Sequence, residues 1–175
     1  MSVRIPRRVQ MSRQHPWRAD NPDAIIVAGH HAWSNPYRVE RWNMARGEKQ
    51  LWWVPWLGVA DYTPEPQLFA HRTDAARLAS QMFAARILGS IPYLPAAMVP
   101  LSGHDLACWC PIWDRETPCP VCHGDGAYLD RAEADSGHWC EACDGSGCAR
   151  WPCHADVLLR LANPDVQFPW AEATR

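Results

Sequence analysis

The chain has 175 residues, 47% of them hydrophobic and 11 of them tryptophan, which is enough apolar surface for one folded domain. Its 17 basic and 19 acidic residues nearly balance, and the net charge of -2 excludes a global attraction to nucleic acid. No apolar run approaches the roughly 20 residues of a membrane span, and no apolar segment follows the basic N-terminus as in a secretory signal. We therefore expect a cytoplasmic protein with no membrane partner.

The N-terminal segment is rich in arginine and predicts a first strand. Alternation from Val3 to Ser12 is typical of a strand, and Pro6 confines it to a sheet edge or to an irregular path. Its charges predict either contacts with the phosphates of a nucleic acid or a solvated basic strand. The arginines that precede the first acidic residue are Arg4, Arg7, Arg8, Arg13 and Arg18.

Two further segments in the first third predict extended structure. Residues 24–28 form a short apolar run, typical of a central strand that is covered on both faces. This run leads into a turn-rich segment that contains Trp33 and Asn35. Residues 51–56 hold three tryptophans and predict a hairpin or an aromatic flap.

A helix is predicted to begin at Thr73, whose hydroxyl would cap it, with Asp74 favourable in the first turn and Gly89 at the end. Apolar residues at helical spacing predict a side that faces the core. They are Leu78, Met82, Phe83 and Ile87.

The C-terminal part predicts one more strand and one more helix. Residues 105–110 alternate as a strand does, and residues 153–162 form a helix that Asn163 and Pro164 end. Strands that lead through loops into helices predict an α/β fold with a small, mostly parallel sheet flanked by helices.

Four of the eight cysteines form a repeated pattern, CxxCxGxG, at residues 119–126 and 140–147. Each CxxC offers two thiolates, and the glycines that follow let the backbone turn back toward the sulfurs. Two such pairs predict a four-cysteine zinc site, with a disulfide or redox pair as the alternative. A reducing cytoplasm favours the metal over disulfides. The predicted ligands are Cys119, Cys122, Cys140 and Cys143.

This pair of repeats resembles half of the cysteine-rich zinc module of DnaJ-type co-chaperones, which has four repeats. The resemblance implies one zinc ion and does not imply chaperone activity, because no J-domain signature precedes the repeats. We expect residues 114–150 to form an inserted zinc module, and residues 1–113 with 151–175 to form the α/β core.

Three other segments together resemble an uncharacterised family, domain of unknown function 4326, which is frequent in actinobacteria and their phages. They are residues 25–37, the run Leu106-Ala-Cys-Trp-Cys-Pro111, and the run that begins at Cys153-His154. The resemblance implies a small α/β domain and no known activity. In typical members the two cysteine runs lie close together, whereas 42 residues separate them here, which again suggests an insertion.

The same segments predict a site at the carboxyl edge of the sheet, where open α/β folds bind ligands. Cys110 ends a strand, Cys153 and His154 open a helix, and Trp33 and Asn35 follow another strand. Three interpretations stay open. These residues form a pocket for a nucleotide or another anion, or they belong to the core without a ligand, or a second metal is held by Cys108, Cys110, Cys153 and His154.

Two functions are consistent with this sequence. The first is a zinc-binding accessory factor that contacts a nucleic acid or a protein partner. The second is an enzyme that acts on a nucleotide or nucleobase, with Cys110, Cys153, His154 and Asp156 at the sheet edge. We favour the first, because zinc with four cysteines has no open position and the chain has no Walker loop, GxSxG or HExxH motif.

Overall fold

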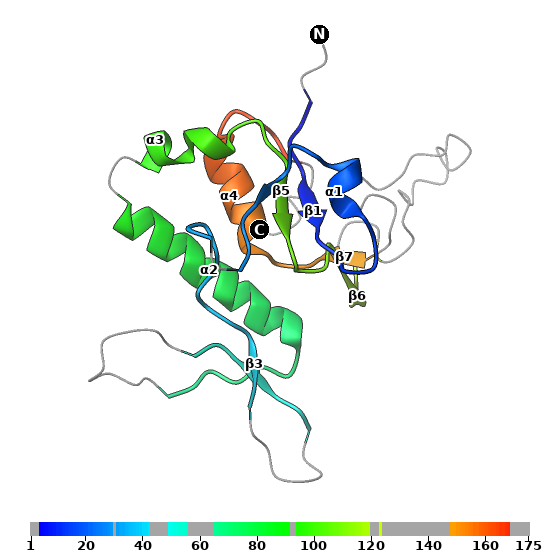
Figure 1. The fold of residues 1–175 in the computed structure, drawn as a ribbon. Coiled ribbons are helices and arrows are strands. Elements are labelled where there is room, and N and C mark those ends of the chain that lie inside the picture. The colour runs from blue at the N-terminus through cyan, green and yellow to red at the C-terminus, as the bar shows by residue number, and fades with distance from the viewer. Residues whose placement is uncertain are drawn as a thin grey trace, which may run out of the picture.

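A three-stranded parallel sheet forms the centre of the protein (Figure 1). The computed structural model describes residues 4–29, 31–42, 49–55, 65–91, 94–119, 123 and 148–168. The strand order is β1 (Arg8–Gln10), β5 (Leu106–Cys108) and β2 (Ile25–Ile26). Helices flank this sheet, so the predicted α/β fold with a small, mostly parallel sheet is confirmed.

The central strand of the sheet is β5, and the prediction of a central strand at residues 24–28 is wrong. Within the described sheet β2 pairs only with β5, and Ile25 and Ile26 stay partly exposed. By contrast, β5 has a strand on each of its edges and helix α4 packed against it, and its Leu106 and Ala107 are fully buried. The expected edge position of the first strand is confirmed, since β1 also has β5 as its described partner.

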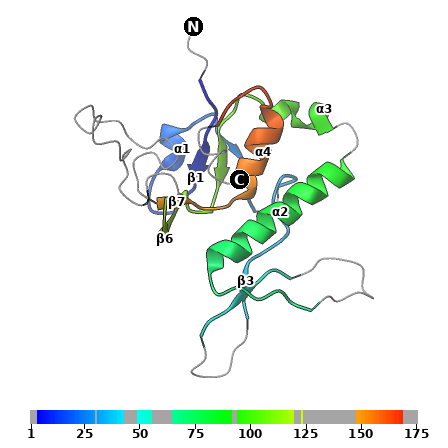
Figure 2. The same ribbon diagram turned by 180° about the vertical axis from the view of Figure 1, so that it is seen from behind.

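Helix α4 (His154–Ala162) lies between the sheet and the other core helices, as the two opposite views show (Figure 2). It contacts β1 and β5 on one side and α2 (Arg72–Ser90), α3 (Leu94–Met98) and the 3-10 turn Val99–Leu101 on the other. A short helix, α1 (Trp17–Asp20), follows β1. Among the described residues, no helix is long and apolar enough to cross a membrane.

Helix α2 begins and ends slightly differently from the prediction. Its N-cap is His71, which has extended backbone angles, and Thr73 is instead buried in the first turn. Gly89 lies within the helix, which runs on to Ser90. The predicted apolar side is divided between two clusters. Phe83 and Ile87 belong to the main core, whereas Leu78 and Met82 pack on a smaller cluster that contains Val54, Ala75 and Ala79.

Of the two predictions for residues 51–56, a hairpin or an aromatic flap, the hairpin is confirmed for the described residues, and Trp56 lies outside them. Strands β3 (Glu40–Arg41) and β4 (Trp52–Trp53) pair antiparallel, and Trp52 forms a further bridge with Phe69. The rings of Trp42 and Trp53 meet edge to face, with 5.2 Å between their centroids. The hairpin contacts α2 through β4.

A second antiparallel pair lies at the two ends of the predicted zinc module, residues 114–150. Strand β6 (Trp113–Pro118) pairs with β7 (Cys148–Arg150), and both strands fall almost entirely within the predicted bounds. Of the four predicted ligands, Cys119 is buried, and Cys122, Cys140 and Cys143 lie outside the described residues. The zinc module and its boundaries therefore stay predictions.

If the zinc module is an insertion, replacing residues 119–147 by a short Gly/Ser linker should leave a core that melts cooperatively. The β6–β7 pair should be retained, because Arg150 on β7 is bonded to Asp156 in the core. A thermal melt followed by circular dichroism tests this. A variant without a cooperative transition would mean that the replaced segment is part of the core.

Candidate metal centre

Four potential metal ligands meet where β5 ends and α4 begins. They are Cys108, Cys110, Cys153 and His154, and their ligating atoms all lie within 4.8 Å of one another. Cys108 is the last residue of β5, and Cys153 is the N-cap of α4. Three of the four are buried and Cys110 is half-buried. Two short runs that are far apart in sequence thus supply two ligands each.

Local backbone geometry turns the cysteine sulfurs toward one point. After β5 the chain bends, and the amide N–H of Cys110 donates to Sγ of Cys108 at 3.5 Å. At the start of α4, the amide N–H of Ala155 donates to Sγ of Cys153 at 3.4 Å. Amide donors stabilise sulfur as a thiolate, which is the form that binds a metal.

The distances between the donor atoms fit one tetrahedral ion. Sγ of Cys108 lies 3.6 Å from Sγ of Cys153, and Nδ1 of His154 lies 3.7 Å from Cys153 and 4.0 Å from Cys108. Zinc–ligand bonds of ordinary length place two sulfurs about 3.8 Å apart and a sulfur and a nitrogen about 3.6 Å apart. A disulfide would require about 2.05 Å between sulfurs. The group can therefore hold a metal ion with no large rearrangement.

His154 is oriented for ligation through Nδ1. Its Nε2 lies 2.7 Å from the carbonyl oxygen of Val27, which can only accept, so Nε2 carries a proton and donates it. In the neutral ring this leaves the Nδ1 lone pair directed at the two sulfurs. Phe83 packs edge to face on the ring, with 5.3 Å between centroids. A backbone carbonyl that fixes the tautomer is the usual outer partner of a metal-bound histidine.

Without a metal, the donor atoms share protons. Hydrogen bonds from Cys108 and Cys110 hold the pKa of the Cys153 thiol well below its ordinary value, and the hydrogen bond to Cys108 raises the pKa of Cys110. Burial opposes the charged form of His154, but its hydrogen bonds with Cys108 and Cys153 outweigh burial and raise its pKa to about 10. The cluster thus keeps protons that a bound cation would replace.

A buried arginine ties the two ligand runs together, and the sequence did not reveal it. The fully buried side chain of Arg8 donates to Asp156 at 2.6 Å and to the carbonyl oxygens of Pro111, Ile112 and Trp151 at 2.8–2.9 Å. Arg150 completes the group with a bond of 2.7 Å to Asp156. Burial lowers the pKa of Arg8, but the charges of Asp156, Cys153 and Cys110 outweigh it and raise the pKa overall.

Two interpretations were offered for the N-terminal arginines, contacts with phosphates and a solvated basic strand. Both are wrong for Arg8, because its side chain is buried and paired within the protein.

The other N-terminal arginines lie on the surface. Arg4 and Arg7 bond the carboxylate of Asp105, and both side chains stay largely exposed. The guanidinium of Arg13 lies 5.8 Å from the ring centroid of Trp109, and that of Arg18 lies 5.3 Å from the ring centroid of Trp17. Contacts with phosphate stay open for these four residues.

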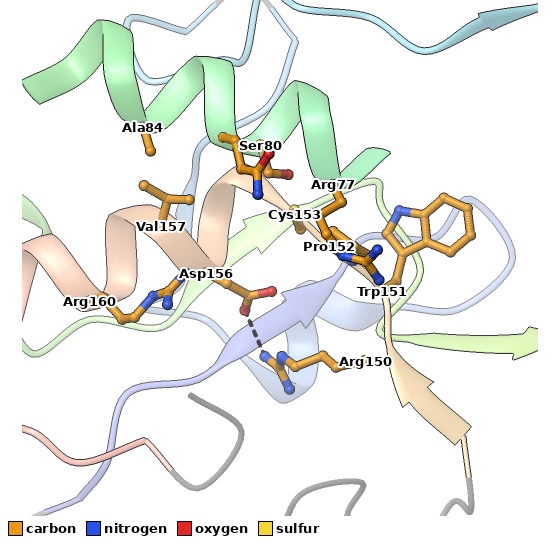
Figure 3. Close-up of a pocket in the computed structure, with 11 residues that line it drawn as sticks. Arg77, Ser80, Ala84, Arg150, Trp151, Pro152, Cys153, Asp156, Val157 and Arg160 are labelled. Atoms are coloured by element: carbon orange, nitrogen blue, oxygen red, sulfur yellow. Dashed lines mark hydrogen bonds and ion pairs between the residues drawn. The ribbon is translucent and has the colours of Figure 1, made fainter. Parts of the chain in front are cut away.

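Two cavities border the candidate metal centre, and Trp151 and Pro152 line both of them. One, of about 270 Å³, lies between α2 and α4, and Figure 3 shows Arg150 bonded to Asp156 beside it. The other, of about 330 Å³, we call the edge pocket. Its lining includes four of the predicted site residues, Asn35, Cys110, Cys153 and His154. Trp33 does not line it but packs against the core.

Asn35 lines the edge pocket and stabilises the backbone beside it. Its side chain accepts from the amide of Tyr37 at 2.9 Å and donates to the carbonyl of Ala79 at 3.2 Å, which ties the segment after β2 to α2. The pocket also contains residues that the sequence did not single out as a site. They include Ser34, Arg38, Arg72, Trp109 and Trp151.

Comparison with known proteins gives a family and no activity. No curated protein and no solved structure matches the chain. The model of one family, a domain of unknown function (DUF4326), matches residues 9–130, which include β2, β5, all of β1 except Arg8, and both Cys108 and Cys110. That match spans more than half of the 175 residues, so the chain belongs to the DUF4326 family.

Proposed function

We propose that the protein is a zinc-binding module in which Cys108, Cys110, Cys153 and His154 bind one ion. The spacing of 3.6 Å between Cys108 and Cys153, with Nδ1 of His154 at 3.7 Å from Cys153, carries this proposal. Three thiolates and one imidazole are the ligands of structural zinc sites, and hard cations such as Mg²⁺ and Ca²⁺ prefer oxygen.

The ion would have a structural role. Four protein ligands fill a tetrahedron and leave no position for a substrate or for an activated water. The ion would link the end of β5 to the start of α4, beside the edge pocket. This supports a binding module, an accessory factor for a nucleic acid or a protein partner, over an enzyme with catalytic zinc.

Metal content tests the proposal. Purified wild-type protein should contain two zinc ions per chain, one in the Cys3His centre and one in the predicted four-cysteine module. Changing Cys108 and Cys153 together to serine should remove one ion, because serine is a poor zinc ligand. The matched control, Cys119→Ser with Cys140→Ser, should remove the other. Inductively coupled plasma mass spectrometry measures both losses.

Cobalt(II) distinguishes the two sites by their donor sets, since three sulfurs with one nitrogen and four sulfurs give different visible spectra. The Cys119/Cys140 variant should keep the spectrum of the mixed set. If the Cys108/Cys153 variant holds as much zinc as the wild type, or if the wild-type centre contains iron, the proposal is wrong.

A further inference from the structure

The edge pocket lies at the carboxyl ends of β2 and β5, where parallel sheets of this class bind ligands. Its volume of about 330 Å³ is at the lower end of the range for small-molecule sites, roughly 300–1,000 Å³. The metal centre forms one wall, Gly29 and residues 34–39 form another, and Arg72 at the start of α2 closes a third side. The pocket therefore has room for one small ligand.

The charges around this pocket favour an anion. Its lining contains Arg38 and Arg72 and no acidic residue, although the chain as a whole has more acidic than basic residues. A zinc ion with three thiolates carries one net negative charge, and the group of Arg8, Arg150 and Asp156 carries one net positive charge beside it. These two charges offset each other, so Arg38 and Arg72 leave the pocket positive.

Arg72 is held in a position suited to a phosphate. Its guanidinium lies 5.5 Å from the ring centroid of Trp52 and 5.4 Å from that of Trp151. Contact with the rings holds the planar group and leaves its N–H edge for a bidentate acceptor. Within the described part of the chain, Arg72 forms no ion pair.

The pocket also offers an aromatic surface and an unused polar atom. Trp109 stands between two of the metal ligands and is 51% exposed, and the guanidinium of Arg13 lies 5.8 Å from its ring centroid, so a base would stack on the part of the ring that Arg13 leaves free. The buried Oγ of Ser34 has no hydrogen-bond partner in the described structure. Gly29, with φ of +81°, has open space where a side chain would stand. A flat, polar ligand would use all three.

The geometry points to a single nucleotide unit as the ligand of the edge pocket, with its phosphate at Arg72 and Arg38 and its base against Trp109. This inference rests on the proposed zinc centre, which would fix Trp109 between its ligands Cys108 and Cys110. The nucleotide can be free or part of a single strand, since both present the same phosphate and base.

Isothermal titration calorimetry of zinc-loaded protein at low salt tests this with three probes: adenosine 5′-monophosphate, inorganic phosphate and a deoxythymidine decamer. Arg72→Ala should weaken binding of all three by about tenfold or more, because a charge-assisted bidentate contact is lost. Trp109→Leu should weaken the two nucleotide probes by about fivefold or more and leave phosphate unchanged. Arg38→Ala is a second, independent test of the phosphate contact.

Arg86→Ala is the matched control, because Arg86 is exposed on the same helix and lines neither cavity beside the metal centre. It should bind like the wild type. A decamer that binds about tenfold or more tighter than the monophosphate supports a site for single strands, and the reverse order supports a free nucleotide. Either order of affinity supports the inference, provided that Arg72→Ala and Trp109→Leu weaken binding as stated above.

Zinc content and a thermal melt of each variant separate the two proposals, since neither Arg72 nor Trp109 is a ligand. If zinc-loaded wild-type protein binds none of the probes, the proposed nucleotide site is wrong, and the proposed zinc centre is not affected. The same holds if Arg72→Ala and Trp109→Leu bind as the wild type does. Wild type that contains no zinc in the Cys3His centre overturns the proposed function itself.

Discussion

Replacing Arg8 with methionine should lower the free energy of unfolding by about 3–5 kcal/mol, the usual effect of breaking a buried ion pair from one side. The Arg8 side chain is fully buried, and its loss leaves the carboxylate of Asp156 with Arg150 as its one ionic partner among the described residues. The carbonyl oxygens of Pro111, Ile112 and Trp151 lose a donor as well. Urea unfolding measures the change.

Arg7→Met is the matched control for this experiment. Arg7 is next in sequence, but its side chain is 67% exposed, and the buried carboxylate of Asp105 keeps its bonds to Arg4 and to the backbone amide of residue 7, so the loss should change stability by less than about 1 kcal/mol. Domains of this kind have about 5–15 kcal/mol of stability in total, so the Arg8 variant should be close to unfolding. If both variants unfold at the same urea concentration, Arg8 does not tie the ligand runs together.

Zinc should stabilise the fold through His154. In a background that lacks the predicted four-cysteine site (Cys119→Ser, Cys140→Ser), free zinc at about a thousand times its dissociation constant should add about 4 kcal/mol to the free energy of unfolding. His154→Ala should abolish this dependence, because it removes one ligand and the bond to Val27. Urea unfolding with buffered zinc and with a chelator measures it.

His104→Ala serves as the control, since His104 is exposed and is not part of the metal centre. Its stability should depend on zinc as strongly as that of the background. Zinc dependence that persists in the His154 variant would place the stabilising ion elsewhere in the chain.

The sequence predicted those parts of the fold that depend on local pattern. The last helix was predicted from residue 153 to 162, and the structure places it at His154–Ala162 with Cys153 as its cap. Strand β5 and the aromatic hairpin were predicted for the same reason. The central position was assigned to the wrong strand, because an apolar run such as Ile25–Val27 shows that a strand packs on a core and does not show how many neighbours it has.

The candidate metal ligands could be found from the sequence because cysteine and histidine are rare residues that stand out where a strand ends and a helix begins. Arg8 could not be found in this way. Its partner Asp156 lies 148 positions later, and an arginine in an arginine-rich segment gives no sign that it is buried. The same applies to Arg72, since only the fold places it between Trp52 and Trp151.

The order of the strands also affects how the protein folds. Strand β1 can pair only after β5 has been synthesised, because Arg8 pairs with Leu106. The ion pair that buries Arg8 forms later still, when Asp156 on helix α4 comes into contact with it. During synthesis at about 5–20 residues per second, β1 and β2 leave the ribosome many seconds before helix α4. Loop-closure entropy makes such distant pairings slow to form. Until α4 docks, the early strands and the thiols of Cys108 and Cys110 stay exposed to solvent, and in this interval the nascent chain is most vulnerable to aggregation and oxidation.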